Sequence, residues 1–230
     1  MGFDNSGFLF GRESAAVTRA LLALDVTSAV VDEAIEQGAE LIISHHPLIF
    51  SPLKSVTDEK LLKLARHQIG VISMHTNLDI AQGGVNDVLM RALGAEEMSG
   101  LDEDGCGRVG TLAEAVTMEA FLPFCKRVLN TAGLRYYDSG RRVFKLAVMG
   151  GSGGDSLEAA FRLGCDTYLT ADIKYHQFLE AQEMGINLID GDHFCTENLI
   201  IPVLARRLGE AFPKIEFTVS QRHHQVVCFA

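Results

Sequence analysis

Positive charge is scarce in this sequence. Of its 230 residues, 20 are Lys or Arg and 30 are Asp or Glu, which gives a formal net charge of -10. Nucleic-acid binding depends on clustered Lys and Arg that neutralise phosphates. The two Arg pairs here, Arg141-Arg142 and Arg206-Arg207, are far apart in the sequence. We therefore expect no nucleic-acid partner.

Long apolar runs and paired cysteines are missing too. No apolar stretch reaches the roughly 18 residues that span a bilayer, and the N-terminus lacks the basic and apolar segments of a secretory signal. The cysteines form no C-x-x-C pair, which argues against a disulfide framework or a thiolate zinc site. Reduced thiols are typical of the cytosol, so we expect a cytoplasmic protein with no membrane partner. The cysteines are Cys106, Cys125, Cys165, Cys195 and Cys228.

The sequence does have a repeated order of helical segment, glycine and short apolar strand. A helix over 27–37, ended by Gly38, precedes an apolar strand over 41–43. The other expected helices cover 61–67, 118–132, 155–163 and 174–183, and the other expected strands cover 71–74, 144–149, 167–169 and 186–189. Such alternation predicts a layered α-β-α architecture of the α/β class with a mostly parallel sheet.

Composition also predicts two lobes. The Gly- and Asp-rich segment 101–110 and the polar, turn-like segment 137–142 bracket one helical stretch. We expect residues 1–100 to form the first part of one lobe, residues 101–185 a second α/β lobe, and residues 186–230 the remainder of the first.

Three polar clusters follow three of the expected strands. They are Ser44-His45-His46-Pro47, His75-Thr76-Asn77-Leu78-Asp79 and Asp192-His193-Phe194-Cys195-Thr196-Glu197. Ligand sites in α/β sheets gather beyond the carboxyl ends of the strands. The clusters are therefore expected to share a site.

The spacing within the clusters allows metal binding, and each also has a simpler interpretation. Adjacent His45 and His46 in extended chain point to opposite sides, so two neighbouring ions could each take one; the alternative is a polar surface loop. His193 and Glu197, at i and i+4, share a helix face if a helix begins after Asp192; the alternative is a capped helix start with an exposed Glu.

Taken together, the candidate ligands mix nitrogen and oxygen. They are His45, His46, Asp79, His193 and Glu197. Such a set suits Zn, Mn, Fe, Co or Ni and discriminates poorly among them. Glu197 could bridge two ions about 3.5–4 Å apart, as in two-metal hydrolytic sites.

The order of these motifs resembles one family. Phe3-Asp4-Asn5-Ser6-Gly7, the three clusters above and Thr170-Ala171-Asp172-Ile173-Lys174-Tyr175-His176 occur in the order found in the type-2 GTP cyclohydrolase I homologues, also called Nif-three-like proteins. The resemblance implies a toroidal homohexamer of two-lobed α/β subunits with a dinuclear metal site. It implies His46 and Asp79 on one ion, His45 and His193 on the other, and Glu197 touching both.

The resemblance and the motifs also suggest roles beyond the ligands. His75 and His176 resemble cavity-lining residues of the family and could relay protons, so with Glu197 they are the catalytic candidates. Asp172 could orient His176. Cys195 is expected to be a packed thiol. For the loop Gly150-Gly151-Ser152-Gly153-Gly154, a tight strand-to-helix turn is favoured over a phosphate-binding loop.

The expected function is that of a metal-dependent hydrolase acting on a small molecule. Purine nucleotide ring opening, phosphoester hydrolysis and amide hydrolysis are all compatible with the ligands. The alternatives are a non-catalytic, metal-stabilised binding or regulatory protein, and a nucleotide-binding module built on the Gly150–Gly154 loop.

Overall fold

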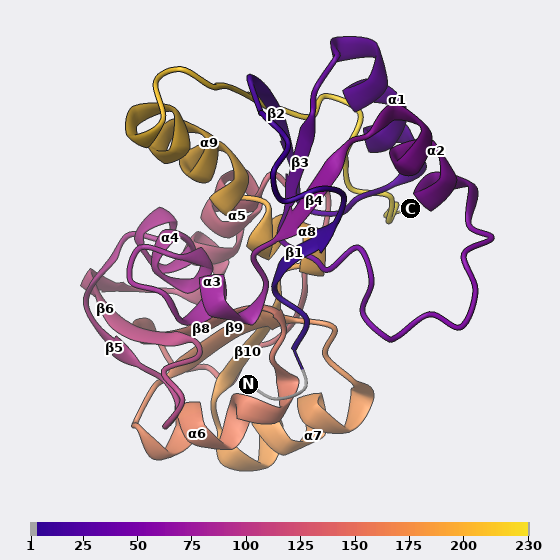
Figure 1. Cartoon of the computed structure of the whole chain (residues 1–230). Coiled ribbons are helices and arrows are strands. Elements are labelled where there is room, and N and C mark those ends of the chain that lie inside the picture. Colours follow the sequence, from indigo (N-terminus) through magenta and orange to yellow (C-terminus); the bar gives the residue numbers. More distant parts are fainter. Residues whose placement is uncertain (1–3, 230) are drawn as a thin grey trace. The chain divides into compact units, whose positions relative to one another are not determined.

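The fold is α/β and is built on two sheets (Figure 1). The computed structural model describes residues 4–229, the side chain of Glu97 excepted, so Phe3 of the N-terminal motif lies outside the described residues. Backbone contacts divide the chain into two compact units. Unit 1 comprises Met1–Leu78 and Ile201–His224, and unit 2 comprises Asp79–Ile200 and Gln225–Ala230.

Unit 1 contains a five-stranded sheet in the order β1-β4-β3-β2-β11. Its strands are β1 (Gly7–Phe10), β2 (Arg19–Ala23), β3 (Leu41–Ser44), β4 (Gly70–Ser73) and β11 (Glu216–Val219). β11, β2, β3 and β4 run parallel, and β1 pairs antiparallel with β4. The carboxyl ends of four strands therefore share one edge of this sheet.

Local sequence explains the helices of unit 1. α1 (Ser28–Gln37) begins after Thr27, whose side chain accepts a hydrogen bond from the Val30 amide, and ends at Gly38 with a φ of 66°. α2 (Glu59–His67) is capped by Asp58. Both expected helices are confirmed. They cover one sheet face, where their apolar residues join Leu21, Ile42 and Val71 in one cluster, and Figure 1 shows α9 (Ile200–Ala211) on the opposite side.

Unit 2 contains a six-stranded sheet in the order β5-β6-β8-β9-β10-β7. Its strands are β5 (Ala95–Gly100), β6 (Arg108–Val116), β7 (Arg135–Tyr137), β8 (Val143–Ser152), β9 (Thr167–Ala171) and β10 (Asn187–Asp190). β8, β9 and β10 run parallel, whereas β5, β6 and β7 join antiparallel. Both sheets thus have a parallel centre, and the second is mixed towards its edges.

Helices pack on both faces of the second sheet because its strands alternate. Leu146 and Val148 belong to a cluster with α4 and α5, whereas Ala147 and Met149 belong to a cluster with α6 and α7. The helices in or entering this unit are α3 (Thr76–Ile80), α4 (Val85–Ala92), α5 (Met118–Leu129), the 3-10 turn η1 (Gly154–Ser156), α6 (Leu157–Arg162), α7 (Tyr175–Met184) and α8 (His193–Glu197).

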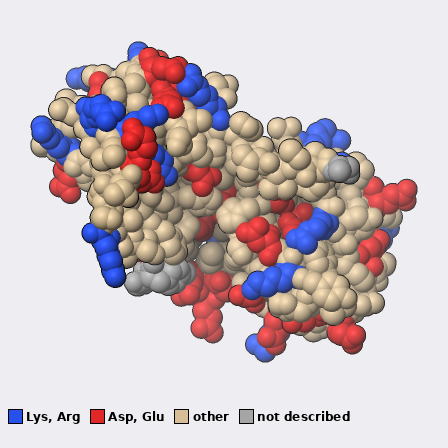
Figure 2. Space-filling view, turned by 90° about the vertical axis from the view of Figure 1, so that its right-hand side faces the viewer, with Lys and Arg blue, Asp and Glu red and all other residues tan. Residues whose placement is uncertain are grey.

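Some sequence expectations differ from the structure. The lobe boundaries expected at residues 100 and 185 fall elsewhere, because β5 and β10 both pair within the second sheet. Residues 226–229 form no strand, and the last strand among the described residues is β11. In the described part of the chain, every helix is too short or too polar to cross a membrane. On the face in Figure 2, Lys and Arg lie scattered among Asp and Glu.

Candidate metal-binding residues

Imidazoles gather at the carboxyl edge of the unit 1 sheet. His45 and His46 follow β3 directly, and His75 follows β4 after one residue. The ring centroids of His45 and His46 are 5.0 Å apart, and those of His45 and His75 are 5.4 Å apart. Each of the three residues offers a nitrogen, and these nitrogens lie within 4.8 Å of one another. The parallel register of β3 and β4 brings them together.

The expectation that His45 and His46 point to opposite sides is wrong. Alternation holds only while a strand continues, and β3 ends at Ser44. Beyond it, the His46 amide donates to the Leu24 carbonyl and the Ser44 hydroxyl donates to the His46 carbonyl. These bonds bend the chain, so both rings join one cluster.

Each of these rings has its Nδ1 against a protein acceptor. Nδ1 lies 2.8 Å from the Met74 carbonyl in His45, 2.7 Å from Asp25 in His46, and 2.6 Å from Asp4 in His75. A carbonyl or ionised carboxylate can only accept, so Nδ1 carries the proton and the lone pair of the neutral ring lies on Nε2. Metal-ligating histidines are oriented in this way by their outer partners. The cluster therefore fits a divalent cation.

The carboxylates of Asp4 and Asp25, which lie against the rings of His75 and His46, are both held in the ionised form. Burial raises the pKa of Asp4, but hydrogen bonds from Ser6, Thr76 and His75 outweigh it and hold the pKa well below its ordinary value.

Burial likewise raises the pKa of Asp25, and hydrogen bonds from His223 and His46 bring it well below its ordinary value. Asp4, Asp25 and His223 were not predicted as site residues. Their contacts join segments 21 to 198 residues apart. Asp4 stands in the N-terminal motif that carries the family resemblance, whereas no motif contains Asp25 or His223.

Unit 2 brings His193 and Glu197 together on α8. Asp192 caps this helix by accepting from the Cys195 amide, as predicted. His193 Nε2 lies 3.1 Å from Glu197 Oε2, and His193 Nδ1 lies 2.7 Å from Asp172, which follows β9. The hydrogen bond to Glu197 is the main reason that the pKa of His193 is raised to about 9, with Asp172 adding to it against burial. A cation would replace the proton here.

The backbone is unusual at two residues next to His193: Asp192, which precedes it in the chain, and Asp172, which contacts its ring. Asp192 has a φ of 71° and Asp172 a φ of 53°, both in the left-handed region that non-glycine residues rarely adopt. Such conformations cost about 1–3 kcal/mol each and concentrate at functional sites. Asp172 pairs with His193, and the prediction that it orients His176 is not what the structure shows. His176 is exposed on the first turn of α7.

The glycine loop after β8 makes room for Glu197. A Cβ on Gly151, whose φ is 65°, would lie 2.2 Å from Glu197 Oε1. The Gly150 amide donates to Asn86, the Gly151 amide to Thr196 and the Gly153 amide to Thr170. Because these amides already donate to side chains, the loop is the tight turn that the sequence favoured. The need for glycine beside Glu197 could not be read from the sequence.

Asp79 and Cys195 are the other residues of unit 2 that the sequence singled out. Asp79 lies in α3, and its carbonyl accepts from the Asn86 side chain 3.1 Å away. Cys195 is buried, and burial followed by the charge of Asp192 raises its pKa to about 11. A neutral, packed thiol is what the sequence indicated.

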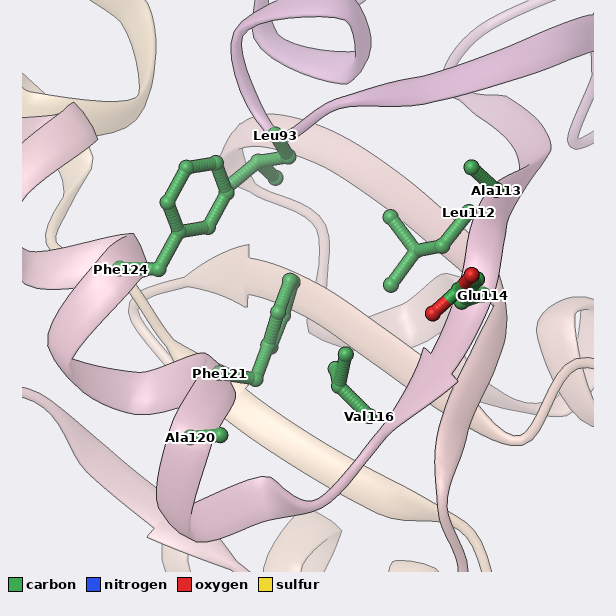
Figure 3. A pocket seen from close by; sticks show the side chains of 8 residues that line it. All are labelled: Leu93, Leu112, Ala113, Glu114, Val116, Ala120, Phe121 and Phe124. Carbon is green, nitrogen blue, oxygen red and sulfur yellow. The ribbon is translucent and has the colours of Figure 1, made fainter.

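Unit 2 also has an apolar pocket of about 410 Å³. Figure 3 shows Phe121 and Phe124 from α5 facing Leu112 and Val116 from β6 across it, with Glu114 as its carboxylate. The other lining residues are Leu93, Ala113 and Ala120. This lining lacks the paired imidazoles and carboxylates that a metal centre needs.

Comparison with known proteins identifies the family. The family model Duf34/NIF3 (NGG1p interacting factor 3) matches residues 1–225. A Clostridium perfringens protein named "GTP cyclohydrolase 1 type 2 homolog" is 36% identical to this chain, over 96% of this chain's length and 89% of the length of the Clostridium protein. A Bacillus cereus protein related to NIF3 superposes with a TM-score of 0.93 at 25% identity, over 100% of this chain and 94% of its own. A Staphylococcus aureus hypothetical protein superposes with a TM-score of 0.93 at 30% identity, over 100% of this chain and 93% of its own. With its α/β fold and its paired imidazoles and carboxylates, this chain belongs to the Duf34/NIF3 family.

Proposed function

We propose that this protein binds two divalent metal ions and hydrolyses a small molecule. The proposed ligands are His45, His46, Asp79, His193 and Glu197, and the ions belong to the group Zn, Mn, Fe, Co and Ni. One observation carries the proposal: His45, His46 and His193 each have Nδ1 on a carbonyl or carboxylate acceptor, 2.7–2.8 Å away. This orienting pattern is the usual one around ligating histidines.

The chain's own residues would perform distinct tasks around the ions. Bound divalent ions would polarise the substrate and lower the pKa of a water. Glu197 is 4% exposed and is held beside His193 by the helix that both share, so its carboxylate is placed for binding before any ion arrives. The Nδ1 proton of His75 is donated in a hydrogen bond to Asp4, so Nε2 is the ring atom that would take up or release a proton. His176, the third catalytic candidate, is exposed to solvent.

The substrate class is proposed from the family. The printed name of the Clostridium perfringens relative, "GTP cyclohydrolase 1 type 2 homolog", favours a purine nucleotide as the first compound to test. Phosphoester and amide bonds are the other hydrolysable groups that a dinuclear centre would accept.

We further propose a cytoplasmic homohexamer without a nucleic-acid or membrane partner. The homohexamer follows from the family resemblance. Five cysteines with no disulfide among the described residues and a net charge of -10 support the rest. Light scattering after size-exclusion chromatography tests the assembly; about 150 kDa is the mass expected from six chains of 25.0 kDa each.

Metal content and turnover together test the proposed function. Wild type, Glu197→Gln and the control Glu114→Gln, a carboxylate of the apolar pocket, are purified without chelator and assayed for metal by mass spectrometry. Each is then incubated with GTP, a phosphoester and an amide. Two ions in wild type and Glu114→Gln, fewer in Glu197→Gln, and turnover that Glu197→Gln loses support the proposal. Two ions without turnover would favour the non-catalytic binding protein. A wild type without metal, despite full supply, overturns both.

A further inference from the structure

The segment after β11 extends the contacts of the histidine cluster. We propose that His223 is a positioning residue: acting through Asp25, it fixes the imidazole of His46 and thereby strengthens metal binding there. This inference rests on the proposed function, since it concerns the affinity of one of its ligands. His223 belongs to none of the motifs that carry the family resemblance.

Sheet topology brings His223 to the right edge. β11 pairs in parallel with β2, with Val219 opposite Leu22. The Ser220 amide continues this pairing by donating to the Leu22 carbonyl at 2.8 Å. Asp25 leaves β2 at the same carboxyl edge, two residues after the strand ends. Two neighbouring parallel strands thus deliver a carboxylate and an imidazole side by side.

Helix α1 holds the segment in place. The Glu33 carboxylate accepts from the Ser220 hydroxyl, from the Gln221 amide at 2.9 Å and from the Arg222 amide at 3.2 Å. Glu33 is 4% exposed, so these bonds replace water that it has lost on burial. Arg222 also pairs with Glu36, one turn further along α1. Helix α1 therefore fixes the backbone just before His223 through Glu33 and Glu36.

The Asp25 carboxylate then joins two imidazoles. His223 Nε2 lies 3.1 Å from Asp25 Oδ2, and His46 Nδ1 lies 2.7 Å from Asp25 Oδ1. The His223 side chain is 9% exposed, whereas that of Asp25 is 41% exposed. An exposed carboxylate can rotate and take water in place of one partner. Because His223 occupies one oxygen, the other oxygen stays directed at the His46 ring.

This arrangement predicts an effect on affinity that a purely structural contact would not have. Outer partners of metal-ligating histidines typically contribute about 10–100-fold to metal affinity. Because His223 acts one residue further out, we expect about tenfold at most. His224, the adjacent residue, has Nδ1 3.1 Å from the Arg222 carbonyl and is exposed, so it provides a matched control.

The test is a double-mutant cycle on the full chain, with Zn²⁺ affinity measured by competition with a chromogenic chelator. His223→Ala is expected to weaken the binding of one Zn²⁺ by about threefold to tenfold, with an unchanged far-ultraviolet spectrum. His223→Gln, whose amide nitrogen can replace the ring donor, is expected to recover most of the loss, and His224→Ala to bind as wild type does. In an Asp25→Asn background, the further change His223→Ala is expected to have little effect, because the two residues act as one unit.

The outcomes separate this inference from the proposed function. If wild type binds no Zn²⁺, the proposed function fails and the inference fails with it. If wild type binds two ions and His223→Ala binds them as tightly, the inference alone is wrong. Equal losses on His223→Ala in the wild-type and Asp25→Asn backgrounds would also overturn it, since His223 would then act without Asp25.

Discussion

Gly151 offers a sharp test of how Glu197 is placed. An alanine there would bring its Cβ to 2.2 Å from Glu197 Oε1 and to 3.1 Å from His193 Nε2. Real Cβ atoms do not approach a heavy atom so closely, so Glu197 must leave its position. Gly151→Ala is therefore expected to bind fewer ions than wild type, with no ligand residue changed.

A second glycine separates this contact from backbone strain. Gly185 has a φ of 66°, nearly that of Gly151, and a Cβ there would meet nothing within 4 Å. Both alanine variants should lose about 1–2 kcal/mol from the left-handed backbone. Only Gly151→Ala should lose about 1–3 kcal/mol more, from overpacking beside a buried carboxylate.

Urea unfolding followed by circular dichroism measures the stability difference, and mass spectrometry measures the metal content. We expect Gly151→Ala to be less stable than Gly185→Ala and to hold clearly less metal, while Gly185→Ala holds as much as wild type. If the two variants have equal stability and equal metal content, Glu197 is not packed against this loop and the reasoning is refuted.

Three further predictions concern stability. Asp87→Ala should cost about 3–5 kcal/mol, because it removes the carboxylate that pairs with Arg108 in the interior of unit 2 and leaves that buried charge uncompensated. Burial raises the Asp87 pKa, but the Gly83 amide and Arg108 hold it below its ordinary value. The contribution of the ionised Asp87 carboxylate to stability is therefore full at neutral pH and falls as the pH drops below about 4. Urea midpoints should then decline less steeply with acid in Asp87→Ala than in wild type; a parallel decline would contradict this. Thr27→Ala should cost about 1 kcal/mol through loss of the α1 cap, and Ser28→Ala close to nothing, in the same assay. Removal of the metal by a chelator should lower the wild-type unfolding temperature by about 5–10 °C. A metal ion present at 100 times its Kd stabilises the folded protein by about 2.7 kcal/mol, and each kcal/mol shifts the unfolding temperature of a chain of this size by about 2–4 °C. An unchanged temperature would argue against resident ions.

Local signals predicted much of the fold. Helix α1 was found because Thr27 and Gly38 mark its two ends in the sequence, and α8 because Asp192 precedes His193. The short strands β3 and β4 were found because apolar residues stand between a helix end and a polar cluster. Caps and alternation depend on residues a few positions apart, so a single sequence reveals them.

Long-range pairing could not be predicted in the same way. β2 and β11 were not expected, and their pairing places Asp25 beside His223, 198 residues later. The predicted direction of the His46 side chain was wrong because a hydrogen bond to Leu24, the residue after the neighbouring strand β2, bends the chain there. The candidate ligands were identified by residue type, whereas the pairing of His46 with Asp25 and of His193 with Asp172 became visible only in the structure.

Anomalous scattering from crystals of the metal-loaded protein tests the central claim most directly. Data collected on both sides of the absorption edge of the bound metal should show two peaks per chain. We predict ligation by His46 through Nε2, with its Nδ1 remaining on Asp25, and by Glu197 through its carboxylate. Absence of any peak near these residues, or ligation of His46 through Nδ1 with Asp25 displaced, would contradict the account.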